Sequence, residues 1–503
     1  MNTKIVFRLL ILNAAFCTFS CSTKEGKKQP LPNFLILMSD NQSWNHLGCY
    51  GDPVLKTPVI DELAATGIRF TQAYCSAPSC SPARASMLTG QDIWRLEQAA
   101  NLWSDFPPRL TVFTELLEEA GYLVGYEGKG WGPGDWKGAG RTKDPSGKKF
   151  NSFEEFYNEK GKGQPFFYWF SSRDPHRPYK ENSWVKFKDD LGKIEVPPYL
   201  PDNEEVRKDI ADYYGEIENF DMDVASCIQL LKEMGQFENT LIIVCSDNGW
   251  QMPRGLANLY DFGMRIPLII SMPERFKGGR VVDDFVSLND VAPTFLELAG
   301  LKIPEEMNAR SMYKILESDK QGIVDKSRNF VVGARERHAF VRKGGAGYGS
   351  RSYRTKDFLY IRNYEPEAWP AGDPPLYGDV DAHMLHYPCA TKMNILKNKE
   401  KEGIKELFEL GFGKRSAEEL FDLNKDPFQM KNVAGSEEYR QIKEQLSAAL
   451  TKYLIKTNDP RETGGDMKWI NAAYYADKDK RPRPGEEAQR ELNLKAEYSY
   501  IDD

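Results

Sequence analysis

Short, wholly apolar segments that end in a polar residue recur along the first two thirds of the chain. The segment 32–40, PNFLILMSD, ends on Asp40, and the segment 240–246, TLIIVCS, is followed by Asp247. Strands buried on both faces of a parallel sheet have this composition, because helices cover the sheet on both sides. Further strands of this kind are expected at 69–74, 122–126, 165–170 and 267–271.

Amphipathic segments separate these apolar runs. Helices are expected at 57–67, 111–121 and 210–234, and the first has Pro58 in its first turn and Gly67 at its end. Strands that alternate with helices imply right-handed βαβ units and a mostly parallel sheet. Ligands bind beyond the carboxyl ends of the strands in such sheets, which is where the acidic tips are expected to lie.

The pattern changes beyond about residue 330. The segment 352–363, SYRTKDFLYIRN, alternates as a half-solvated antiparallel strand does, and a strand and turn at 418–433 precede a helix expected at 437–456. We therefore predict an α/β fold with a mostly parallel sheet sandwiched by helices over residues 32–330. Residues 331–503 are expected to form a smaller C-terminal α+β subdomain, built on an antiparallel sheet, and a tail.

The N-terminus has the composition of an export signal. Lys4 and Arg8 give a positive start to an apolar stretch that is too short to span a bilayer. The stretch ends at Cys21, and this junction resembles a bacterial lipoprotein cleavage site. Residues 1–20 are then a signal peptide, 21–31 a linker, and Cys21 the lipidated first residue of a cell-envelope protein that faces the periplasm or the surface. An ordinary signal peptide cut nearby is the alternative.

Composition narrows the classes of function. The chain has 67 Lys and Arg against 74 Asp and Glu, a formal net charge of −7, so it lacks the basic footprint of a non-specific nucleic-acid binder. A hydrophobic content of 41% is enough for a large core. Eight cysteines in 503 residues are too few for a disulfide scaffold, and five histidines argue against a His-rich metal site. A globular enzyme or binding protein remains.

The segment 79–90, SCSPARASMLTG, is the most informative motif. Cys80, Pro82 and Arg84 fit the pattern C-x-P-x-R, and the extended block resembles the signature of type I sulfatases. In that family the cysteine is oxidised after synthesis to formylglycine, whose hydrated aldehyde is the nucleophile. The resemblance implies an alkaline-phosphatase-like fold and, as a partner, a formylglycine-generating or anaerobic sulfatase-maturating enzyme. The alternative is a packed or disulfide-bonded Cys80 beside a turn.

The family chemistry explains these residue types. A sulfate ester requires a strong oxygen nucleophile and cationic groups that neutralise three sulfonyl oxygens. A geminal diol attacks through one hydroxyl and later expels sulfate with the other, whereas an ordinary serine would remain trapped as a sulfate ester.

Two further blocks resemble the metal-binding elements of the family. Asp40 and Asn41 follow the first strand, and Asp247 and Asn248 belong to an SDNG block after a later strand. With the oxygen of a modified Cys80, these residues would surround a hard divalent cation. An all-oxygen site suits Ca²⁺, and Mg²⁺ less well because of its strict octahedral geometry. The family has an acidic residue where this chain has Asn41, and the SDNG block alone also fits a simple turn.

Three basic residues match catalytic positions of the family. The resemblance implies that Arg84 holds the formylglycine hydroxyl and that Lys129, in a G-K element, bridges sulfate and formylglycine. His176, in the segment DPHRP, matches a D-P-H-x-P element and is the best candidate to protonate the leaving oxygen. A lone histidine is more often structural, but this context favours the catalytic role.

Two positions depart from the family pattern. Trp131 stands where the family usually has histidine, and Leu256 stands where many relatives have a lysine before the Y-[ED]-x-G-x-R-x-P element. A missing cation weakens stabilisation of the transition state unless Arg254 replaces it. We therefore expect Arg254, and Arg265 within the element itself, to bind substrate. The departures indicate an unusual subset or reduced activity.

The resemblance implies a sulfuric ester hydrolase that acts on a sulfated carbohydrate. The subset with the most similar blocks includes heparan N-sulfatase-like enzymes and enzymes that act on algal ulvan and carrageenan, and we favour O-sulfate over N-sulfate. The alternatives are a heparan-type N-sulfatase, a phosphatase or phosphonate hydrolase of the same superfold, and a catalytically reduced glycan-binding lipoprotein. Segments 335–338 and 383–386 are candidate subsite segments.

Overall fold

The computed structural model describes residues 30–381, 389–475 and 486–492, and the statements below concern these residues. Residues from Pro32 onward form one compact unit, and Met1–Leu31 count as a separate one. The predicted signal peptide, the lipidation site Cys21 and the segment 383–386 lie outside the described residues. No helix within the described part is long and apolar enough to cross a membrane.

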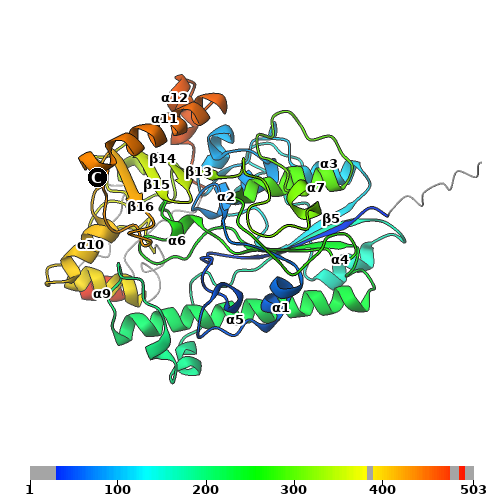
Figure 1. The fold of residues 1–503 in the computed structure, drawn as a ribbon, viewed down its shortest axis with the longest axis horizontal. Coiled ribbons are helices and arrows are strands. Elements are labelled where there is room, and N and C mark those ends of the chain that lie inside the picture. Colours follow the sequence, from blue (N-terminus) through cyan, green and yellow to red (C-terminus); the bar gives the residue numbers. More distant parts are fainter. Residues whose placement is uncertain (1–29, 382–388, 476–485, 493–503) are drawn as a thin grey trace, which may run out of the picture. The chain divides into compact units, whose positions relative to one another are not determined.

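An eight-stranded sheet forms the centre of the unit that begins at Pro32 (Figure 1). The strands occur in the order β11-β2-β10-β9-β1-β8-β5-β7. Only β10 is antiparallel to its neighbours, so the prediction of a mostly parallel sheet is confirmed. The bounds are β1 (Asn33–Ser39), β2 (Ile68–Phe70), β5 (Leu123–Gly128), β7 (Lys148–Lys149), β8 (Phe166–Ser171), β9 (Thr240–Ser246), β10 (Leu268–Ser271) and β11 (Arg280–Val282).

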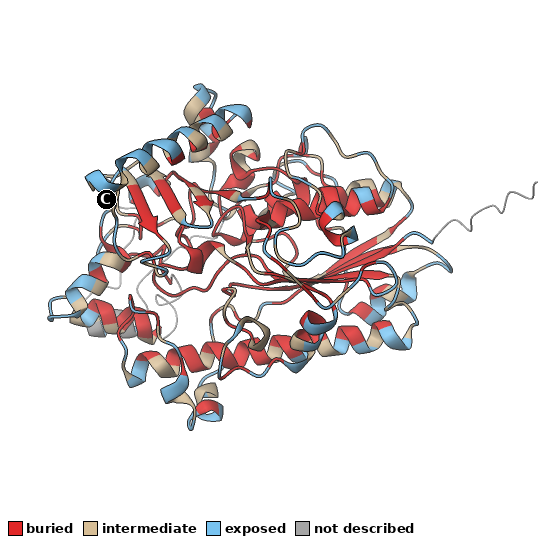
Figure 2. Ribbon diagram, in the orientation of Figure 1, coloured by how far each residue is buried: buried red, intermediate tan, exposed pale blue. Residues whose placement is uncertain are grey.

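Helices cover both faces of this sheet (Figure 1). One face carries α1 (Pro58–Thr66), α4 (Phe153–Glu159) and α5 (Glu204–Glu233), and the other carries α2 (Cys80–Thr89), α3 (Phe113–Glu119) and α7 (Val291–Leu298). Alternate residues of β1 point to the two faces: Leu35 packs in the core with α1 and α5, and Ile36 in the core with α2, α3 and α7. The strands are therefore buried on both sides, as Figure 2 shows.

The C-terminal part contains a four-stranded antiparallel sheet in the order β13-β14-β15-β16. Its strands are β13 (Phe330–Arg335), β14 (Ser350–Thr355), β15 (Phe358–Asn363) and β16 (Glu418–Asp422), and α11 (Arg440–Lys456) packs on β14 and β15. This confirms the predicted α+β part. It belongs to the same compact unit as the large sheet.

Two predicted strands are wrong in their extent. The segment 352–363 is a hairpin of β14 and β15, because the chain bends at Lys356 and Asp357. The segment 69–74 divides into β2 in the large sheet and β3 (Ala73–Tyr74), which pairs with β12 (Val286–Ser287).

The remaining elements are short or lie at the periphery of the two sheets. They are β4 (Ser104–Asp105), β6 (Gly134–Asp135), α6 (Asp261–Met264), α8 (Tyr313–Glu317), α9 (Ala390–Asn398), α10 (Ile404–Phe412), α12 (Pro460–Thr463) and α13 (Glu486–Leu492).

Candidate active site

Four adjacent parallel strands, β9, β1, β8 and β5, present the predicted site residues at their carboxyl ends. Asp247 directly follows β9, Asp40 follows β1, Lys129 follows β5, and His176 lies in the loop after β8. Cys80 is the first residue of α2. The rule that ligands bind beyond the carboxyl ends of parallel strands therefore locates this site.

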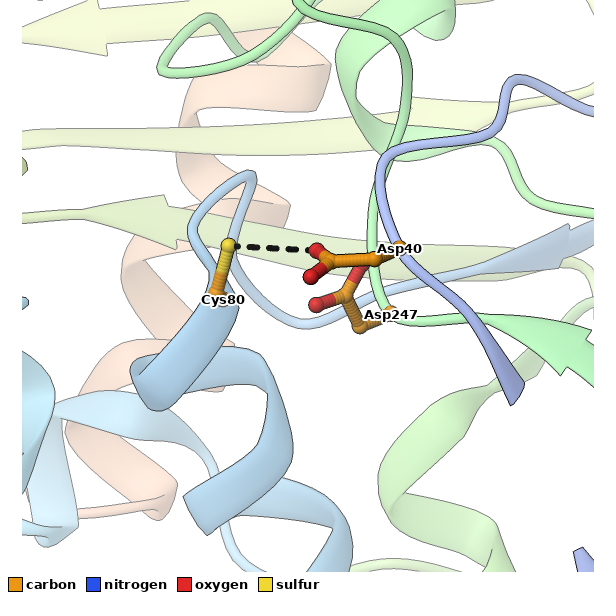
Figure 3. Close-up of side chains that lie close together, drawn as sticks. All are labelled: Asp40, Cys80 and Asp247. Carbon is orange, nitrogen blue, oxygen red and sulfur yellow. Dashed lines mark hydrogen bonds between the residues drawn. The ribbon is translucent and has the colours of Figure 1, made fainter. Parts of the chain in front are cut away.

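The thiol of Cys80 lies against the tip of β1. Its Sγ atom is 3.6 Å from Oδ1 of Asp40 and 3.6 Å from Oδ1 of Asn41. Figure 3 shows the side chains of Asp40, Cys80 and Asp247 pointing toward one another, and one potential ligand atom of each lies within 4.8 Å of the others. Asn41 has a φ of 68°, and its backbone N–H donates to Oδ1 of Asp247 at 3.0 Å, which joins the tips of β1 and β9.

Arg84 lies one helical turn after Cys80 and is completely buried. Its Nε donates to Oδ2 of Asp247 at 2.8 Å, and its Nη1 donates to the carbonyl oxygen of Gly130 at 2.8 Å and to the hydroxyl of Ser171. Burial alone would lower the pKa of the guanidinium, but the nearby carboxylates outweigh it and raise that pKa. The side chain is therefore a fixed positive charge beside residue 80.

Lys129 supplies a second positive charge. Its Nζ lies 2.5 Å from Oδ2 of Asp40. Burial opposes the charge, but Asp40 outweighs burial and raises the pKa of Lys129. Two carboxyl groups and two basic side chains thus surround the thiol, and their formal charges cancel.

The thiol itself is poorly suited to act as a thiolate. Burial raises the pKa of Cys80 to about 12, with Asp40 and Asp247 adding to the shift and Lys129 opposing it. A cysteine that stays protonated at neutral pH is a weak nucleophile. The surroundings therefore agree with a role for residue 80 after chemical modification.

The polar atoms at the strand tips fit a hard divalent cation. Asp40, Asn41, Asp247 and Asn248 are all buried and offer carboxylate and amide oxygens. Both polar atoms of the Asn248 side chain are buried without a hydrogen-bond partner among the described residues. Leaving such an amide unsatisfied costs free energy, and a cation coordinated by its oxygen removes the part of that cost that the oxygen contributes. Oxygen donors without histidine suit Ca²⁺ or Mg²⁺ better than Zn²⁺.

His176 is oriented by its neighbour in the loop after β8. Its Nδ1 donates to the main-chain carbonyl oxygen of Arg177, so a second proton on the ring would reside on Nε2. Burial, together with the positive charge of Lys129, lowers the pKa of His176 to about 3. The imidazole is therefore neutral before an anion arrives.

Arg254, which the sequence predicts to bind substrate, makes its hydrogen bonds with the C-terminal part, and its role toward substrate stays a prediction. Its Nη1 donates to the carbonyl oxygen of Leu410 at 3.0 Å, and its Nη2 to that of Gln429. The guanidinium lies over the ring of Tyr260, 3.8 Å from the centroid. The side chain joins the loop after β9 to the C-terminal part.

Arg265, the other predicted substrate-binding residue, is also engaged elsewhere. It donates through Nε to the carbonyl oxygen of Thr71 at 3.0 Å and lies over the ring of Trp44, 4.6 Å from the centroid. These contacts hold two loops together, and a role of Arg265 in substrate binding stays a prediction.

The two departures from the family pattern, Trp131 and Leu256, offer the site no free hydrogen-bond donor. Trp131 is buried, and its Nε1 donates to the carbonyl oxygen of Ser81 at 3.1 Å, in the first turn of α2. Leu256 is also buried. Neither side chain supplies the polar group that the family pattern leads one to expect.

Sequence reasoning missed two contributors. Ser171, which accepts a hydrogen bond from Arg84, ends β8 and had the same signal as Asp40, a polar residue that closes an apolar run. Ser79 lies with its Oγ 2.9 Å from Nδ1 of His338. No sequence signal connects Ser79 with His338, because the two residues are far apart in the chain.

Comparisons with known proteins agree with this geometry. The model of the family described as Sulfatase matches residues 32–301, more than half of the chain. An ulvan-active sulfatase of Formosa agariphila is 26% identical over 450 residues, which cover 85% of this chain and 81% of the relative. The human N-sulphoglucosamine sulphohydrolase is 27% identical over 484 residues, which cover 85% and 91%.

The fold has a counterpart among solved structures. A protein solved in complex with its substrate D-glucosamine-2-N,6-O-disulfate superposes with a TM-score of 0.64 at 18% identity, over 87% of this chain and 100% of that one. The match of the family model includes Asp40, Cys80, Arg84, Lys129 and Asp247. The chain therefore belongs to the sulfatase family, whose members hydrolyse sulfate esters and generally depend on formylglycine and a metal ion.

Proposed function

We propose that the protein removes sulfate from a sulfated carbohydrate, through formylglycine at position 80 and a bound Ca²⁺. The observation that carries this proposal is the convergence of Cys80, two aspartates and two cations at the ends of β9, β1 and β5. An oligosaccharide derived from an algal polysaccharide of the ulvan or carrageenan type is the favoured substrate, because relatives named as ulvan-active sulfatases match most of the chain. Hydrolysis of an N-sulfate is the alternative that the human relative supports.

Two groups complete the chemistry. Formylglycine at position 80 supplies a hydroxyl of its hydrated aldehyde as the nucleophile. A Ca²⁺ held by Asp40, Asn41, Asp247 and Asn248 supplies a positive charge that polarises the sulfate group.

The protein's own residues then bind the anion and move protons. Arg84 and Lys129 neutralise charge that builds up on the sulfonyl oxygens. The carboxylate of Asp247 takes the proton that the attacking hydroxyl loses. Nε2 of His176 protonates the leaving oxygen, and a bound sulfate next to the ring favours the protonated imidazole that this step requires.

The test is release of sulfate from a panel of defined substrates by protein co-expressed with a maturation enzyme. The panel contains ulvan and carrageenan oligosaccharides, N-sulfated glucosamine and a phosphonate ester. We expect sulfate from an O-sulfated member, loss of that activity in Cys80→Ala, and normal activity in Cys227→Ala, which removes another buried thiol away from the cluster.

Chelation followed by metal addition separates the alternatives. Recovery with Ca²⁺ supports the proposal. Recovery with Zn²⁺ alone, together with turnover of the phosphonate ester, contradicts it in favour of a phosphatase or phosphonate hydrolase. Converted protein that binds the glycans and releases no sulfate contradicts it in favour of a glycan-binding protein.

A further inference from the structure

His338 lies beside the active site, although the roles assigned above do not use it. It follows β13 in the chain, is buried, and contacts Ser79, the residue before Cys80. The positive charge of Lys129 also acts on its ring. The imidazole is therefore within electrostatic range of the site.

The hydroxyl of Ser79 is directed to this histidine and does not cap its own helix. A serine before a helix usually accepts a hydrogen bond from the N–H of the second or third helical residue. In α2 the third residue is Pro82, which has no N–H, and Ser79 makes no side-chain cap. Its Oγ lies 2.9 Å from Nδ1 of His338.

The ring has one proton, and the contact with Ser79 determines its place. Burial lowers the pKa of His338 to about 4, with Arg335, Arg342 and Lys129 adding to the shift and Asp379 opposing it. The imidazole is therefore neutral near pH 7. Within the described part of the chain, the ring nitrogen is the only hydrogen-bond partner of the Ser79 hydroxyl. We assign the hydroxyl as the donor to Nδ1, because a hydroxyl that accepted there would leave its own proton without an acceptor; the proton of His338 is then on Nε2.

Positions 131 and 256 leave the site without two side-chain donors that the family pattern leads one to expect. The indole N–H of Trp131 is committed to the carbonyl oxygen of Ser81, and Leu256 has no donor. Arg254 is bound to carbonyl oxygens of the C-terminal part. A neutral donor adds to the cations Arg84 and Lys129 without the repulsion that a third buried cation would meet.

We propose that Nε2 of His338 donates a hydrogen bond to the sulfate group bound beside residue 80. His338 is then a substrate-contacting residue, and it compensates for the donors absent at positions 131 and 256. This inference rests on the proposed function, because it takes a sulfate group as the ligand.

Two substitutions separate this role from a purely structural one. The amide of Asn in His338→Asn matches the position of Nδ1, so it keeps the contact with Ser79 and loses the donor at Nε2. The amide of Gln in His338→Gln matches the position of Nε2, so it keeps the donor and loses the contact with Ser79. His46→Gln is the control, because His46 is also buried but bonds Tyr213.

The measurements are the Kd of inorganic sulfate by isothermal titration calorimetry and kcat/KM for a released-sulfate assay. We expect His338→Asn to weaken sulfate binding and to lower kcat/KM, the latter by about 100-fold, as for loss of one donor at a catalytic anion site. His338→Gln is expected to retain most of both, and His46→Gln to match the wild type in sulfate affinity. The inference is overturned if His338→Gln loses more affinity and activity than His338→Asn. It is also overturned if the two variants lose equally or if neither loses any.

The calorimetric measurement uses unconverted protein and needs no turnover. If the variants differ in sulfate affinity as expected while no substrate is hydrolysed, the proposed function fails and the role of His338 stands. If sulfate is released from a glycan and the affinities of all variants are equal, the role of His338 fails and the proposed function stands.

Discussion

The side chains around Cys80 form an electrically balanced group. Asp40 and Asp247 carry two negative charges, and Arg84 and Lys129 carry two positive ones at close range. A divalent cation added to this group gives a local charge of plus two, which favours an anionic sulfate ester. Asn41 contributes to this balance, because an acidic residue there would make the group negative. Asn41 in place of the acidic residue of the family also removes one negative charge from the metal ligands, and this weakens Ca²⁺ affinity.

Site residues at strand ends were predictable, whereas the partners of arginines were not. Asp40 and Asp247 end apolar runs, and this local signal was sufficient to place them. Arg254 was predicted to replace a missing cation, and its hydrogen bond to Leu410, 156 residues further along the chain, was not foreseen. No pattern near an arginine indicates which distant carbonyl oxygen it will meet.

The burial of His46 predicts a pH dependence of the protein's stability. Burial lowers its pKa from 6.5 to about 4, and Asp52 opposes the shift only partly. Between these values the unfolded chain binds a proton that the folded chain does not. Above pH 6.5 His46 is neutral in both states, so it adds no pH dependence to stability. As the pH falls from 6.5 toward 4, protonation of the unfolded chain lowers the free energy of unfolding by up to about 3 kcal/mol.

The check is urea unfolding at pH 7 and pH 4.5 for the wild type and His46→Gln. We expect the wild type to lose more stability than the variant over this interval, so the gap between them narrows at low pH. An equal loss in both proteins would show that His46 is not protected from protonation in the folded state.

At the scale of elements, apolar composition predicts that a strand is buried, but not whether it runs parallel or antiparallel to its neighbours. The bounds expected for the strand at 240–246 agree with β9, and the strands on either side of β1 are parallel to it, as predicted. The antiparallel direction of β10 was not predictable, since its sequence is as apolar as that of its parallel neighbours. The bend between β14 and β15 was missed although Arg354–Asp357 are four consecutive polar residues that interrupt the alternation.

The end of β5 depends on a glycine that positions Lys129. Gly128 has a φ of 75°, and a Cβ atom there would lie 2.0 Å from the carbonyl oxygen of Ser171. Gly128→Ala must therefore displace the end of β5 and with it the ammonium group on Asp40. We expect kcat/KM for sulfate release to fall by at least about tenfold, since one cation leaves its position.

Gly140→Ala is the matched control for this substitution. Gly140 has a φ of 88°, but no atom lies within 4 Å of the place that a Cβ atom would occupy. The variant should lose about 1 kcal/mol of stability from backbone strain alone and keep its activity. Equal kcat/KM values for the two variants would contradict the role of Gly128 in placing Lys129.

At the scale of the whole molecule, buried ion pairs join the C-terminal part to the sulfatase region. Arg354 on β14 lies 2.8 Å from Oδ2 of Asp261 on α6, and Arg177 after β8 lies 2.9 Å from Oδ1 of Asp381.

Because the formal net charge is −7, long-range attraction does not gather a polyanionic substrate. Capture of sulfate must depend on the local cations and on the bound metal ion.

Arg354→Leu tests whether the two regions unfold together. The substitution leaves the carboxylate of Asp261 buried without its partner, which costs about 3–5 kcal/mol. We expect a lower Tm with one transition, at the same temperature by far-UV circular dichroism and by tryptophan fluorescence. Adding Asp261→Leu to this variant should restore part of the loss. Two separated transitions would contradict a single cooperative unit.

The central claim is that modified Cys80 performs the reaction, and the most direct measurement relates conversion to activity. Preparations with different degrees of maturation are analysed by peptide mass spectrometry for the fraction of formylglycine at position 80. The same samples are assayed for sulfate release from the substrate that the panel identifies. We expect a specific activity proportional to the converted fraction and zero for unconverted protein. Activity in fully unconverted protein or in Cys80→Ala would contradict it.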